Sequence, residues 1–159
     1  LVLSAMAVIA AAFNIINASV CKMCHNHRVM FLKNASVITF GCLLVICICL
    51  IINLRTDFIA IIFFILAANA SLTSLLVPVL HLTNRKMMSG TAVSIMNFCF
   101  FTMVGLLGTA MGFLLNLFES EKVGNVIVYS NESYLAVFGL FFLLSVFELY
   151  KAMKLSDKY

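Results

Sequence analysis

Long apolar segments alternate along the chain with short polar ones. Five of them stand out, at residues 1–20, 35–54, 58–80, 90–118 and 134–150. A helix needs about 20 mostly apolar residues to cross the roughly 30 Å of hydrocarbon in a bilayer. Each segment is too long and too apolar for a core strand, and in lipid a single segment satisfies its own backbone only as a helix. The pattern predicts an all-α, polytopic membrane helix bundle with five transmembrane helices.

Composition supports lipid as the solvent of this chain. Hydrophobic residues make up 64% of it and charged residues 10%, and the mean hydropathy is +1.16. A water-soluble domain carries about 25% charged residues, so this chain cannot cover itself with polar groups. It contains no Trp and no interleaving of basic and aromatic residues, so no nucleic-acid partner is indicated. We expect an integral, multi-pass membrane protein whose main partner is the lipid bilayer.

The chain is apolar from Leu1 onward, without the basic start and cleavage site of a signal peptide. We interpret residues 1–20 as the inside of a membrane helix and expect a further segment to precede residue 1. The whole stretch 1–159 then reads as a partial C-terminal transmembrane domain.

Basic residues sort with alternate connections between the predicted spans. Eight of the ten Lys and Arg residues lie in the 21–34 loop, the 81–89 loop and the 151–159 tail. The opposite side has only Arg55 and Lys122, together with four acidic residues. Cytoplasmic loops carry the excess of Lys and Arg. The sequence therefore places both loops and the C-terminus in the cytoplasm and the 119–133 loop on the external side. The membrane we expect is the cell (inner) membrane.

One of these loops contains a possible redox or metal motif. Cys21, Cys24 and His25 form C-x-x-C-H, the spacing of c-type haem attachment, and His27 is a further possible ligand. Haem attachment is expected on the outer face of the membrane, and ordinary zinc modules have a separated second ligand pair. We interpret the stretch as a short basic turn and assign no metal, no cofactor and no enzymatic activity. A membrane redox or metal-binding protein is the alternative.

Polar residues concentrate in some spans and avoid others. The second and fifth spans are nearly bare, which is typical of helices at the periphery of a bundle. The third contains "AANASLTSLLVP", in which Asn69 and Thr73 share a face, Ser71 and Ser74 lie beside them, and Pro78 interrupts the helix pattern. We take Asn69, Thr73 and Asn97 as candidates for a substrate cavity, with Ser71 and Ser74 next.

The fourth span carries a stripe of small and polar residues at steps of three and four. It consists of Ser94, Asn97, Phe101, Gly105, Gly108 and Gly112. Glycines at this spacing let a neighbouring helix approach closely. We assign Gly105, Gly108 and Gly112 to helix packing.

The segment 77–116, "VPVLHLTNRKMMSGTAVSIMNFCFFTMVGLLGTAMGFLLN", resembles a region of the major facilitator superfamily of transporters. A basic loop leads there into a Ser-Gly-Thr-Ala start and a glycine-rich helix, and the "SGTA" entry is most similar to the drug-efflux branch. The resemblance implies that the five spans are helices 8–12 of a twelve-helix fold. It also implies that the eighth, tenth and eleventh helices approach the central cavity. The 21–34 loop lacks the Gly and Asp of the family's pattern.

On this basis we expect a secondary active transporter that moves a small solute or drug by alternating access. Its partners would be a small-molecule substrate and the missing N-terminal helices of the same protein. A small membrane scaffold without transport activity is a further alternative.

Overall fold

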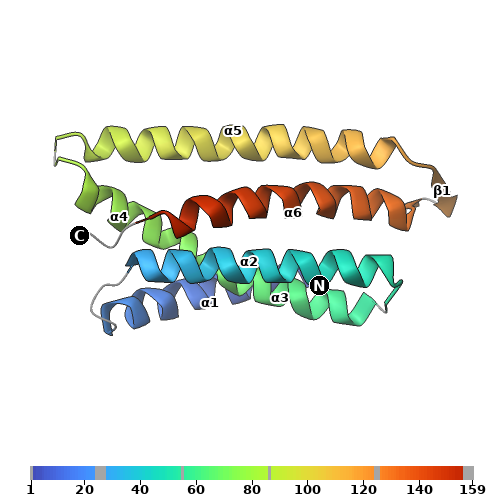
Figure 1. Ribbon diagram of the computed structural model, residues 1–159, viewed down its shortest axis with the longest axis horizontal. Helices are drawn as coiled ribbons and strands as arrows, with labels where there is room; N and C mark the ends of the chain where they lie inside the picture. The colour runs from blue at the N-terminus through green and yellow to red at the C-terminus, as the bar shows by residue number, and fades with distance from the viewer. Residues whose placement is uncertain (1, 24–27, 55, 86, 124–125, 156–159) are drawn as a thin grey trace.

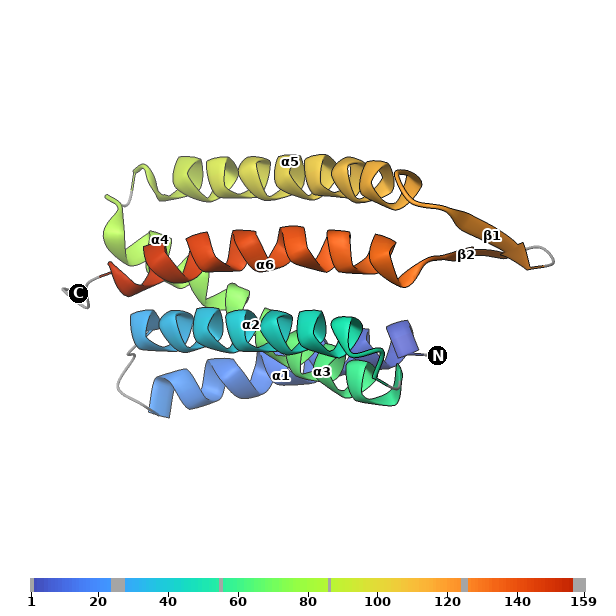
Figure 2. The same ribbon diagram turned by 45° about the vertical axis from the view of Figure 1, so that its right-hand side comes forward.

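The computed structural model describes residues 2–23, 28–54, 56–85, 87–123 and 126–155. Their elements, in chain order, are α1 (Val2–Met23), α2 (Arg28–Ile51), α3 (Thr56–Ala70), the 3-10 helix η1 (Ser71–Leu75), α4 (Leu76–Thr83), α5 (Ser89–Asn116), β1 (Ser120–Val123), β2 (Val126–Tyr129) and α6 (Asn131–Met153). The long helices lie side by side along one axis, with α5 at one edge, then α6, then α2, and with α1 and α3 on the far side (Figures 1 and 2).

Three of the described helices are long and apolar enough to cross a membrane. They are Val29–Ile51 in α2, Ser89–Asn116 in α5 and Asn131–Met153 in α6, and they correspond to the second, fourth and fifth predicted spans. The first and third predicted spans contain the shorter apolar stretches Ala7–Asn17 and Phe58–Ala70. The chain is thus mostly helical and compatible with a membrane protein, and the count of five spans stays a prediction.

The helices extend beyond the apolar segments that predict them. The stretch 21–34, expected as a loop, is helical up to Met23 and again from Arg28, and residues 24–27 lie outside the described part. Hydropathy detects only the portion of a helix that lies in lipid. At the polar ends of the helices, the backbone keeps its helical hydrogen bonds. A long polar side chain such as Lys33 does not prevent this, because it can reach water from a helical backbone. Helical backbone therefore extends into the stretch 21–34 from both sides.

A two-stranded hairpin replaces most of the predicted 119–133 loop. β1 and β2 pair antiparallel, with Ser120 opposite Tyr129 and Val123 opposite Val126. β2 reads Val-Ile-Val-Tyr, a run of β-branched and aromatic residues that favours a strand. The all-α prediction omits this hairpin, which extends past the helices at the end opposite the C-terminus (Figure 2).

The third predicted span is not one helix. α3 ends at Ala70, η1 forms a 3-10 turn, and α4 continues at a different angle (Figure 1). Pro78 has no N–H to donate to the carbonyl of Ser74, and its ring crowds that carbonyl. The regular α-helix is therefore disfavoured upstream of Pro78, and the break lies where the sequence is richest in Ser and Thr.

The most extensive helix contact is between α2 and α6, and most of the buried side chains of α6 are small. The buried residues of α6 are Ser133, Val137, Ser145 and Ala152, at helical spacing. The buried residues of α2 include Leu43, Ile46, Cys49 and Leu50. Small residues allow helices to approach closely in lipid.

The apolar pattern predicts a peripheral α2, yet α2 lies between α6 and α3. A helix that is apolar all round can be covered by protein as well as by lipid.

The turn between α2 and α3 is tied to the start of α6. Asn131 Nδ2 lies 2.7 Å from the Leu50 carbonyl oxygen and 2.7 Å from Asn53 Oδ1. Asn53 has a φ of 55°, in the left-handed region. Asn and Gly tolerate this conformation, whereas β-branched residues do not.

We expect Asn53→Val to destabilise the protein more than Asn53→Gly. Both variants lose the bond to Asn131, but only valine adds the strain of a positive φ, which costs about 1–3 kcal/mol. Thermal unfolding of both purified variants would measure the difference. Equal melting temperatures would show that the turn does not hold residue 53 in this conformation.

Candidate functional site

Asn69 forms a buried polar contact between α3 and α2. Its side chain is only 9% exposed. Nδ2 donates to the Ala35 carbonyl oxygen at 2.9 Å and to Thr39 Oγ1 at 2.8 Å. Thr39 Oγ1 in turn donates to the same Ala35 carbonyl at 3.0 Å. Both amide hydrogens are therefore used, which fixes the orientation of the amide.

The oxygen of the same amide is unsatisfied. Among the described residues, Asn69 Oδ1 is a buried side-chain atom without a hydrogen-bond partner. A buried acceptor without a donor costs about 1–3 kcal/mol, and in native proteins such a group usually meets a ligand, an ion or a water. Asn69 is therefore the strongest indication of a binding site in the described structure.

A carboxylate lies beside the same stretch of α2. Ser36 Oγ is 2.9 Å from Glu148 Oε1 of α6 and 3.2 Å from the Leu32 carbonyl oxygen. Its single hydrogen can be donated to either oxygen. Ser36 is buried, whereas Glu148 is exposed. The contact holds one oxygen of the carboxylate against α2.

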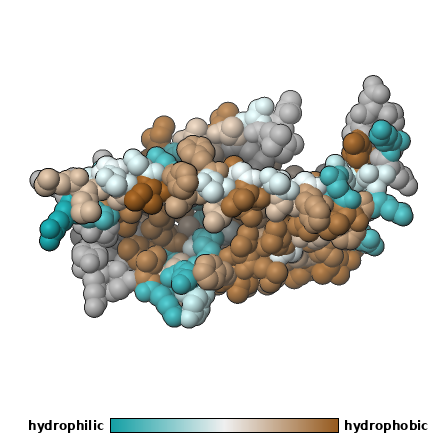
Figure 3. Space-filling view, turned by 90° about the horizontal axis from the view of Figure 1, so that it is seen from above, coloured by the Kyte–Doolittle hydropathy of each residue, from teal (hydrophilic) through white to brown (hydrophobic). Residues whose placement is uncertain are grey.

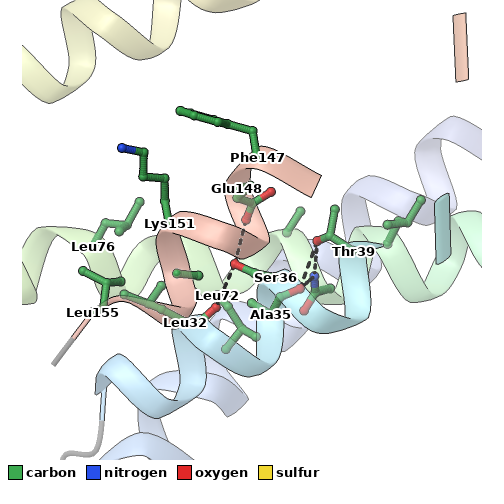
Figure 4. Close-up of a pocket in the computed structure, with 14 residues that line it drawn as sticks. Leu32, Ala35, Ser36, Thr39, Leu72, Leu76, Phe147, Glu148, Lys151 and Leu155 are labelled. Atoms are coloured by element: carbon green, nitrogen blue, oxygen red, sulfur yellow. Dashed lines mark hydrogen bonds between the residues drawn. The ribbon is translucent and has the colours of Figure 1, made fainter. Parts of the chain in front are cut away.

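These polar groups line a pocket of about 750 Å³ between α2, the α3–η1–α4 segment and α6 (Figure 4). Its walls are mainly apolar and include Leu32, Leu66, Leu72, Leu76, Phe147 and Leu155. Lys151 also lines the pocket, but its ammonium group points away from Glu148 and lies 5.3 Å from the centre of the Phe147 ring (Figure 4). The pocket thus combines apolar walls with the polar side chains of Asn69 and Glu148.

Ser71 lies next to this pocket and forms a contact with α1. Asn17 Nδ2 donates to Ser71 Oγ, and Ser71 Oγ donates to the Ala68 carbonyl oxygen at 2.6 Å. Ser71 is buried. Asn17 of the first predicted span and Ser71 of the third therefore meet at the helix break. Thr73 and Ser74 belong to η1, but their side chains lie outside the described part.

Asn97 is not brought to this pocket. It lies on α5, where no residue is buried, and its side chain is exposed. Figure 3, seen from the side of α5, shows apolar side chains over much of this face. A Cβ built at Gly105, Gly108 or Gly112 has no described atom within 4 Å, apart from the glycine itself, its chain neighbours and the nearby backbone of its own helix. Their assignment to helix packing stays a prediction, because none of the described helices packs against these glycines.

Sequence reasoning missed Ser36, Thr39 and Glu148 as members of this site. The second span appears bare because its polar residues precede the apolar run, and Glu148 near a membrane surface is explained by solvation alone. The spacing of Ser36 and Thr39, three apart, places them on one face of α2 and is the signal that could have found them.

The cysteine-histidine motif cannot be assembled from the described residues. Cys21 lies in the last turn of α1, and Cys24, His25 and His27 lie outside the described part. Elsewhere in the described part, no group of three or more metal-ligating side chains comes together.

Comparison of the chain with protein-family models, curated proteins and solved structures found no match.

Proposed function

We propose that this chain is part of a secondary active transporter that moves a small solute or drug by alternating access. It would supply most of the C-terminal half of the protein, as five spans comparable to helices 8–12 of a twelve-helix major facilitator fold. The N-terminal helices of the same protein would complete the cavity.

The observation that carries this proposal is the interrupted helix at Ser71–Leu75. Membrane transporters use discontinuous helices at their substrate and ion sites, because irregular backbone is tolerated in a membrane only where protein or a water-filled cavity covers it. A 3-10 stretch inside a helix often marks a hinge. Here the interruption carries Ser71 and follows directly on Asn69, whose oxygen has no partner among the described residues.

The distribution of charges supports the proposed orientation. The end of α1, the start of α2, the link from α4 to α5 and the end of α6 lie at one end of the bundle (Figures 1 and 2). Basic residues at that end include Lys22, Arg28, Lys33, Arg85, Lys151 and Lys154. The positive-inside rule places this end in the cytoplasm. We therefore propose a cytoplasmic C-terminus in the cell (inner) membrane.

The exposed face of α5 supports the proposal that further helices of the same protein complete the substrate cavity. Asn97 and the three glycines lie on a helix that buries none of its residues against the rest of the described chain. Polar residues inside membrane helices face the bundle interior or a water-filled cavity rather than lipid. We propose that the missing N-terminal helices of the transporter cover this face, with Asn97 directed at the substrate.

Alanine at Asn69 or Asn97 should reduce transport in the full-length protein. Each change removes a polar group from the proposed substrate path, so we expect most of the activity to be lost at equal membrane levels. The assay would first use a panel of labelled sugars, amino acids and organic cations in proteoliposomes to find a transported solute. Asn34→Ala is a suitable control, because Asn34 is exposed on α2 and does not line the pocket. Unchanged transport in both variants would refute the site assignment.

A further inference from the structure

We infer that the pocket between α2, η1 and α6 binds a primary ammonium group carried on an apolar body. Such a ligand is either an ethanolamine phospholipid from the bilayer or a soluble alkylamine. The inference goes beyond the transport proposal and does not depend on it, because it concerns occupancy of the pocket and not movement across the membrane.

The direction of the Asn69 amide favours a ligand that donates hydrogens. If Nδ2 and Oδ1 exchanged places, the oxygen would face the Ala35 carbonyl oxygen, and two acceptors would oppose each other. The bonds to α2 therefore require the nitrogen on that side and leave Oδ1 as the free atom. An acceptor without a partner is satisfied by any group that donates a hydrogen, and an ammonium group is such a donor.

The position of the Glu148 carboxylate favours a positively charged ligand. Glu148 is held at Ser36, and Asn69 is held at Ala35 and Thr39. Residues 35–39 make up about one turn of an α-helix, so the carboxylate and the amide meet the same turn of α2. An ammonium group has three hydrogens to donate and no acceptor. An ammonium group bound at the carboxylate would neutralise it and keep further hydrogens for the amide oxygen beside the same turn.

The charge of Glu148 is not neutralised by an ion pair within the described part of the chain. Among the described residues, it forms a hydrogen bond with Ser36 and no ion pair. Lys151 is one turn away on α6, yet its ammonium group lies on the other side, near the Phe147 ring (Figure 4). Lys151 is therefore available for a second group of the ligand, and the phosphate of a phospholipid would fit it.

The walls of the pocket define the rest of the ligand. The leucine side chains at 32, 66, 72, 76 and 155 offer apolar contacts and few hydrogen bonds. A hydrated inorganic cation would gain nothing from these walls. An alkyl chain would replace the lipid or detergent that otherwise fills the space, while its ammonium group reaches the two acceptors.

The same chemistry predicts selectivity against quaternary ammonium groups. A trimethylammonium group has a positive charge but no N–H, so it can neutralise Glu148 but cannot satisfy Asn69 Oδ1. A primary amine should therefore bind more tightly than its trimethylated counterpart.

The test measures binding to the purified full-length protein in detergent. Dodecylamine and dodecyltrimethylammonium serve as matched soluble probes, and phosphatidylethanolamine and phosphatidylcholine in nanodiscs serve as matched lipids. We expect at least tenfold preference for the primary amine in one pair or both. Glu148→Gln and Asn69→Ala should each remove most of it. Glu132→Gln, an exposed residue in the first turn of α6, should retain it.

The outcomes separate the two sources of the ligand. Preference among the lipids, together with weaker binding of both lipids to Lys151→Gln, identifies a phospholipid, whereas preference among the soluble amines without an effect at Lys151 identifies an alkylamine. Equal binding of primary and quaternary head groups in both pairs would overturn the inference, as would undiminished preference in a folded Glu148→Gln variant. The Asn97→Ala protein should bind normally, so loss of transport and loss of binding can be told apart.

Discussion

Asn69→Asp is expected to destabilise the folded protein by about 3 kcal/mol, close to the cost of an aspartate at the centre of a membrane helix. The change is nearly isosteric, but it replaces the donating Nδ2 by an oxygen. That oxygen would face the Ala35 carbonyl and Thr39 Oγ1, and the threonine hydroxyl already donates to Ala35. The contact with the Ala35 carbonyl thus becomes repulsive, Thr39 can meet the new oxygen only by giving up its bond to Ala35, and a charge is buried.

Asn69→Ala provides the comparison for this variant. It removes both interhelical bonds without adding a charge, and such bonds contribute only about 0.6 kcal/mol each in membranes. Denaturant unfolding in mixed micelles would measure both variants, and the amount of protein in the membrane would give a second readout. If aspartate proved as well tolerated as alanine, the amide would not donate into α2 as described.

Ile46→Ala is expected to lower the free energy of unfolding by about 2 kcal/mol, the low end of the range for such truncations in soluble cores. Ile46 is fully buried in α2, the helix that packs most closely against α6. The cost is at the low end because lipid, not water, is the alternative surrounding of the side chain, so that mainly van der Waals contacts are lost.

Ile48→Ala is the matched control, since Ile48 is two residues away on the same helix and 45% exposed. It should change stability by less than about 0.5 kcal/mol, as is usual for a surface position. Similar losses from both variants would mean that the two faces of α2 are equally covered, contrary to the packing described above.

The sequence itself determined the helical class and the approximate place of the long helices, because a continuous apolar run has only one way to satisfy its backbone in lipid. The second, fourth and fifth predicted spans correspond to α2, α5 and α6. It also located the polar segment around Asn69 and the interruption near Pro78. It did not locate the exact helix ends or the hairpin, because hydropathy measures burial in lipid and not hydrogen bonding of the backbone.

Only the tertiary structure decided which polar residues meet. Asn69 and Asn97 are equivalent in the sequence, yet one is buried against α2 and the other is exposed on α5. Likewise, the stripe that packs closely consists of Ser133, Val137, Ser145 and Ala152 on α6, while the glycines of α5 meet no described helix. The periodicity of a helix fixes which residues share a face, but which neighbour covers that face depends on contacts between segments far apart in the chain, such as Ser36 with Glu148.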